Sequence, residues 1–135
     1  MSNHASTASN TPSRVLKYTS LGLRLVAAAA FLAAGSAKLA GEPMMVKVFE
    51  QISVGQWFRT VTGLVEVAAA IALLIPVTVG LAGLLLAVTM CFATVTHLFF
   101  IGGSPVPAIV LLLITASIAW LHRASILNLI RPMQA

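Results

Sequence analysis

Four long apolar runs separated by short breaks dominate the chain. They cover about residues 21–39, 58–76, 79–101 and 105–122. Each run is close to the ~20 residues that an α-helix needs to cross the ~30 Å hydrocarbon core of a bilayer. Two breaks are rich in the turn formers proline and glycine, Pro76-Val77-Thr78-Val79-Gly80 and Gly102-Gly103-Ser104-Pro105. The pattern predicts an all-α fold, a four-helix transmembrane bundle.

The first apolar run has two interpretations. Basic residues precede it, and the small residues Gly35-Ser36-Ala37 could form the cleavage site of a signal peptide. Alternatively, the run is a retained first transmembrane helix. We favour the retained helix, because cleavage would leave an odd number of spans and remove the packing partner of the next one.

The segment between the first and second runs, residues 41–57, predicts a short amphipathic helix at the membrane surface. Its apolar positions recur every three or four residues, at Met45, Phe49 and Ile52. Such a helix lies in the interface with its apolar face towards the lipid. Pro43 suits its start and Gly55 suits its stop.

The distribution of basic residues predicts the orientation. Residues 1–19 read as a disordered basic cytoplasmic tail, 20–123 as a four-span membrane domain and 124–135 as a cytoplasmic C-terminal tail. The side that holds both termini carries five basic residues, Arg14, Lys17, Arg24, Arg123 and Arg131. The other side carries Lys38, Lys47 and Arg59. Because Lys and Arg favour the inner side, we expect both termini in the cytoplasm.

Composition supports a membrane protein and excludes other classes. Of the 135 residues, 59% are hydrophobic and only 8% are charged, which leaves too little polar surface for a soluble domain. The net charge of +5 comes from residues that flank apolar runs, so we expect no nucleic-acid partner. Cys91 is the only cysteine, which excludes an internal disulfide or a dithiol relay, and we expect it to be inert packing.

Each apolar run carries a stripe of small or polar residues at helical spacing. The stripes are Arg24, Ala28, Phe31, Gly35 and Lys38 in the first run, and Arg59, Gly63, Glu66 and Ala70 in the second. They continue with Gly83, Ala87, Met90, Thr94 and His97 in the third run, and Ala108, Leu112, Thr115, Ala119 and His122 in the fourth. Membrane helices pack through small residues, so we expect these faces to meet at a common centre.

The candidate site is a polar cluster in the outer half of the bundle. The predicted topology brings Lys38, Arg59, Glu66 and His97 towards one another. A charge inside a membrane span is costly unless it is paired or hydrated. Glu66 therefore forms a structural ion pair with Lys38 or Arg59, or it binds a polar ligand head or carries a proton. We predict no catalytic residue. We also predict no metal site, because His97 and His122 lie near opposite membrane faces and cannot share a metal ion.

The order of motifs resembles the DoxX-like family over about residues 20–123. The resemblance rests on AAFLAAGSAKLAG, FEQISVGQWFRTVTGLVEVAAAIALLIP, ATVTHLFF and SPVPAIVLLL. Its most specific positions are Gly35, Lys38, Trp57, Arg59, Gly63, Glu66 and His97. The resemblance implies a four-helix protein of the bacterial cytoplasmic (inner) membrane. The family name derives from a subunit of a thiosulfate:quinone oxidoreductase, and some members join membrane redox complexes.

We therefore expect an accessory, non-catalytic subunit of a quinone-linked redox or stress-response membrane complex. Quinone is the candidate cofactor, and His97 could hydrogen-bond a quinone carbonyl. The expected partners are the lipid bilayer, membrane redox proteins and a second copy of the chain. The alternatives are a small proton-coupled transporter, in which Glu66 exchanges protons, and a purely structural assembly partner.

Overall fold

The computed structural model describes residues 11–134, and none of them lies in a β-strand. Six α-helices follow one another: α1 (Thr11–Ala40), α2 (Pro43–Ile52), α3 (Gln56–Ala72), α4 (Val79–Thr96), α5 (Val106–Leu121) and α6 (Arg123–Ile130). A π-helical turn, η1 (His97–Ile101), continues α4, and a 3-10 turn, η2 (Arg131–Gln134), follows α6. The all-α prediction is confirmed.

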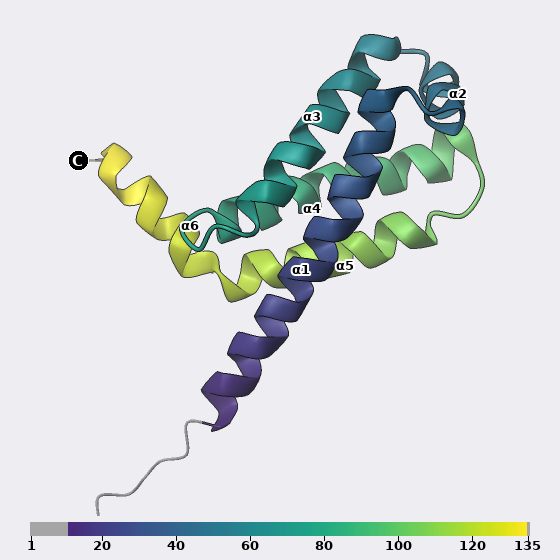
Figure 1. The fold of residues 1–135 in the computed structure, drawn as a ribbon. Helices are drawn as coiled ribbons and strands as arrows, with labels where there is room; N and C mark the ends of the chain where they lie inside the picture. The colour runs from purple at the N-terminus through teal and green to yellow at the C-terminus, as the bar shows by residue number, and fades with distance from the viewer. Residues whose placement is uncertain (1–10, 135) are drawn as a thin grey trace, which may run out of the picture.

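The four longest helices form two antiparallel pairs. Helix α1 packs along α3, and α4 packs along α5. In Figure 1 the α1/α3 pair crosses the α4/α5 pair, and the N-terminal part of α1 extends away from the other helices. Helix α6 turns from the direction of α5 by 61°. The short helix α2 lies at the end of the molecule where α1 ends and α3 begins (Figure 1).

Glycines allow the close approach within the α4/α5 pair. A Cβ atom on Gly80 would lie 2.5 Å from the carbonyl oxygen of His122. A Cβ atom on Gly83 would lie 3.1 Å from the backbone nitrogen of Ala119. Both neighbours are backbone atoms that cannot rotate away. These contacts are the small-residue packing expected between membrane helices.

One hydrophobic core joins the two pairs. It consists of Ala27, Ala28, Phe31, Ala69, Ala70, Leu73, Val79, Ala82, Leu86, Met90, Ala108 and Ile118. Phe31, Leu73, Leu86 and Ile118 are its largest fully buried side chains. All four long helices contribute, so the core sits where the pairs cross.

The striped faces point inward as predicted. None of the stripe residues is exposed, and more than half are buried. The large apolar side chains between the stripes, among them Leu64, Leu84, Phe92 and Leu113, are exposed. A chain with small residues inside and large apolar residues outside is suited to a lipid environment. Cys91 is also exposed rather than packed in the core.

Several boundaries differ from the sequence predictions. Helix α1 begins at Thr11, so residues 11–19 are helical where a disordered tail was expected, and residues 1–10 lie outside the described part. Residues 13–21 contain neither proline nor glycine, so nothing interrupts the helix before the apolar run. The C-terminal tail is also largely helical.

The amphipathic helix predicted within residues 41–57 is present as α2. Pro43 occupies its first turn, as expected, and Phe49 is its buried residue. The stop is different. Ser53 terminates the helix in the left-handed conformation with a φ of 62°, whereas Gly55 immediately precedes α3.

The number of helices that could cross a membrane is smaller than predicted. Within the described residues, Ser13–Ala40 and Val79–Ile101 are long and apolar enough, and the bent pair α5 with α6 would make a third. Helix α3 has 17 residues, or about 26 Å, which is short for the ~30 Å hydrocarbon core. The four-span arrangement therefore stays a prediction.

Candidate functional site

The site begins at the crossing of α1 and α3, where two glycines face each other. A Cβ atom on Gly35 would lie 2.9 Å from the carbonyl oxygen of Gly63 and 2.7 Å from a methyl group of Val67. A Cβ atom on Gly63 would lie 3.1 Å from the Cβ atom of Lys38. The helices can approach this closely because neither glycine has a side chain. The approach brings Lys38 of α1 next to Glu66 of α3.

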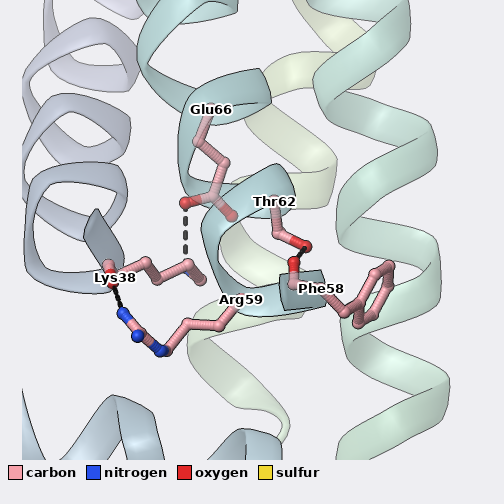
Figure 2. Close-up of polar contacts among 5 residues, drawn as sticks. All are labelled: Lys38, Phe58, Arg59, Thr62 and Glu66. Atoms are coloured by element: carbon pink, nitrogen blue, oxygen red, sulfur yellow. Dashed lines mark hydrogen bonds and ion pairs between the residues drawn. The ribbon is translucent and has the colours of Figure 1, made fainter. Parts of the chain in front are cut away.

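Lys38 and Glu66 form an ion pair between the two helices. The Nζ atom of Lys38 donates a hydrogen bond of 2.8 Å to Oε2 of Glu66. The Glu66 side chain is 2% exposed and the Lys38 side chain 13% exposed, so solvent screens the pair little. Figure 2 shows the Lys38 side chain reaching below the Glu66 carboxylate. The pairing that the sequence left open is thus with Lys38.

Arg59 holds the backbone of the same lysine. Its guanidinium donates a hydrogen bond to the carbonyl oxygen of Lys38 (Figure 2) and a second one, of 2.7 Å from Nε, to Oε1 of Gln56. The last carbonyl groups of a helix have no partner within it and carry partial negative charge. Arg59 therefore caps the C-terminal end of α1, and α3 contacts both the side chain and the backbone of Lys38.

His97 is the fourth predicted site residue, and it has no polar contact with the other three. It is the first residue of η1, where its Nδ1 atom lies 3.4 Å from the carbonyl oxygen of Gly102. Among the described residues, no hydrogen bond or ion pair links it to Lys38, Arg59 or Glu66. The structure thus brings three of the four residues together.

The segment that contains the cluster, residues 38–66, has equal numbers of basic and acidic residues. Lys38, Lys47 and Arg59 accompany Glu42, Glu50 and Glu66 in the part of the sequence from the end of α1 to the middle of α3. Within residues 11–134, no group of three or more His, Cys, Asp or Glu side chains is placed to hold a metal ion. The geometry that is present supports a structural ion pair and a helix cap.

A second set of polar contacts, in the N-terminal half of α1, was missed by the sequence analysis. Ser20 Oγ and His122 Nε2 are hydrogen-bonded at 2.6 Å, and Arg24 Nε donates a 2.7 Å bond to the carbonyl oxygen of Leu73. Arg24 and His122 were both on the predicted inward stripes. That position was the signal, but the predicted spans placed both residues near helix ends, where basic side chains commonly extend to lipid headgroups.

The apolar helices and their inward polar stripes define a helical membrane protein. The model of the DoxX-like family matches residues 22–122. The chain belongs to this family, and the match begins in α1 and ends just after α5. Neither a curated protein nor a solved structure matches the chain.

Proposed function

We propose that the protein is an accessory, non-catalytic subunit of a quinone-linked redox or stress-response membrane complex. The observation that carries this proposal is the buried Lys38–Glu66 pair. Its charges are satisfied by the chain itself, and it fixes α1 against α3. A buried pair of this kind is best attested as a device that specifies how elements pack. In this role it maintains the surface that partner chains recognise.

The same geometry speaks against quinone binding at the cluster. A quinone carbonyl needs a hydrogen-bond donor, and the two cations of the cluster already donate within the chain, Lys38 to Glu66 and Arg59 to Gln56 and to the Lys38 carbonyl. Two open pockets in the described part of the chain, one beside Ser20 and His122 and one beside Pro76 and Ser125, are lined by none of these residues. Quinone is therefore assigned to a partner subunit.

The membrane arrangement is part of the proposal. Helices α1, α3, α4 with η1, and α5 would each cross the bacterial cytoplasmic membrane, and α2 would lie at the outer surface. Both termini would be cytoplasmic, because five basic side chains accompany them. Helix α3 is short for a span, so the bilayer would thin locally or the flanking Arg59 and Trp57 would reach the interface.

The test of the proposed function is purification of the tagged chain from its native membrane in mild detergent. We expect quinone-reductase activity to co-elute with the chain at a mass well above 14.1 kDa. After the subunits are separated, the quinone and the redox difference spectrum should remain with the partner chains. A redox-silent complex, or quinone bound stoichiometrically to the separated chain, would contradict the proposal.

Exchanging the two charged residues distinguishes a structural pair from a ligand site. In the double variant Lys38→Glu/Glu66→Lys the pair can re-form with reversed polarity. We expect its thermal stability in detergent and its co-elution with partners to recover to a large part of the wild-type values, since the single variants each leave a buried charge without its partner. If stability recovers but co-elution does not, the cluster contacts a partner or ligand directly.

A further inference from the structure

An open pocket of about 290 Å³ lies between the N-terminal half of α1 and the junction of α5 with α6. Its lining includes Leu16, Lys17, Ser20, Arg24, Leu121 and His122. The polar side chains come from two segments that are about 100 residues apart in the sequence. The Ser20–His122 hydrogen bond joins those segments, so one wall of the pocket is held in place.

The pocket is positively charged and has no acidic counterpart. Every acidic residue of the chain lies from Glu42 to Glu66, while Arg14, Lys17, Arg24, Arg123 and Arg131 fall outside that range. Residues 38–66 carry three basic and three acidic residues, so the net charge of +5 comes from the five basic residues outside this segment, of which Lys17 and Arg24 line the pocket. A counter-charge for these residues must therefore come from outside the described chain.

Two side chains of the pocket, Arg24 and His122, are held in place by hydrogen bonds. Arg24 donates a hydrogen bond from Nε to the carbonyl oxygen of Leu73, and its guanidinium lines the pocket. Its terminal nitrogens have no hydrogen-bond partner among the described residues. His122 lies just beyond the C-terminal end of α5, where its Nε2 atom is hydrogen-bonded to Ser20.

The position of Lys17 fits the depth of lipid phosphates. Lys17 and Lys38 are separated by about 31 Å along α1, which is close to the ~30 Å thickness of the hydrocarbon core. Leu21 and Leu25 follow Lys17 at four-residue intervals on the same face of α1, and both are exposed. If the phosphate of a lipid lies at Lys17, the acyl chain of that lipid can therefore cover the apolar surface of Leu21 and Leu25.

We propose that this pocket binds a phosphate ester, the headgroup phosphate of an anionic membrane lipid. Lys17 and Arg24 supply the positive charge, Ser20 and His122 supply polar contacts, and Leu16 with Leu121 receives the glycerol end of the lipid. The inference does not depend on the redox role. Basic pockets between membrane helices on the cytoplasmic side are a recognised way of binding anionic headgroups.

The test is native mass spectrometry of the purified chain titrated with phosphatidylglycerol, phosphatidylcholine or inorganic phosphate. We expect saturable binding of phosphatidylglycerol, with at least several-fold weaker binding of the other two. Lys17→Gln should weaken phosphatidylglycerol binding about five-fold, the effect of one basic residue near an anionic surface. Lys17→Arg should retain it.

Lys47→Gln is the matched control, because Lys47 is an exposed lysine on α2 at the opposite end of the fold. It should bind phosphatidylglycerol as the wild type does. Equal losses in the Lys17 and Lys47 variants would show diffuse charge attraction and overturn the site. Equal binding of phosphatidylcholine would overturn anion selectivity, and equal binding of inorganic phosphate would overturn the lipid assignment.

Discussion

Lys38→Met is expected to lower the free energy of unfolding by about 3–5 kcal/mol, the cost of leaving one member of a buried ion pair without its partner. Methionine keeps the length of the lysine side chain and its apolar stem but removes the charge. Glu66, 2% exposed, would then lose the ammonium group that offsets its desolvation. The measurement is reversible unfolding in mixed micelles of a mild detergent and dodecyl sulfate, compared with the wild type.

The double variant Lys38→Met/Glu66→Leu separates the loss of the charge pair from loss of packing. Replacing a whole buried pair with apolar residues is often neutral or stabilising by about 1–4 kcal/mol. We therefore expect the double variant to be at least as stable as the wild type. A double variant as unstable as Lys38→Met would mean that Glu66 carries no uncompensated charge in the single variant, and that packing accounts for the loss.

Gly35→Ala is expected to destabilise the protein by about 1–3 kcal/mol, the usual cost of overpacking. The added methyl group would lie 2.9 Å from the carbonyl oxygen of Gly63 and 2.7 Å from a methyl group of Val67. The Val67 side chain can rotate, but the backbone carbonyl cannot, so α1 and α3 must separate. Because that separation also lengthens the Lys38–Glu66 contact, the loss should be smaller in a background that already lacks the ion pair.

Gly22→Ala is the control on the same helix. A Cβ atom on Gly22 would meet nothing within 4 Å, so the substitution adds helix propensity without a clash. We expect it to stabilise the protein by up to about 1 kcal/mol. Equal effects of the two substitutions in the same unfolding assay would show that the contact at Gly35 is not a close packing point.

The sequence predicted the inward faces of the helices well, for a physical reason. Residues three and four positions apart lie on the same face of a helix, so small and polar residues at this spacing mark one helix face. That argument placed Gly35, Gly63 and Glu66 on the faces that the structure buries. It also placed His97 with them, but periodicity cannot predict the π-helical turn at which His97 lies. The wider turn of η1 changes the direction of the side chains after Thr96.

Helix ends were predicted less well, because the signals there are local and compete. Residues 11–19 are polar and basic, which suggested a disordered tail, yet their helix propensity is sufficient to continue a helix already formed by the apolar run. Ser53 ends α2 although Gly55 has the intrinsic preference for a positive φ. The chain must leave α2 at the residue that allows α3 to reach α1, and this depends on tertiary packing.

The sequence by itself determined the class of the protein and the residues that face inward. Those properties follow from composition and periodicity, which every short segment of the chain carries. Only the tertiary structure decided that Glu66 pairs with Lys38, that Arg59 caps α1, and that Ser20 and Arg24 meet the ends of α5 and α3. These contacts join residues between 21 and 102 positions apart. These contacts depend on how whole helices are rotated and how closely they approach one another. The paired glycines set that approach, and no local sequence pattern specifies it.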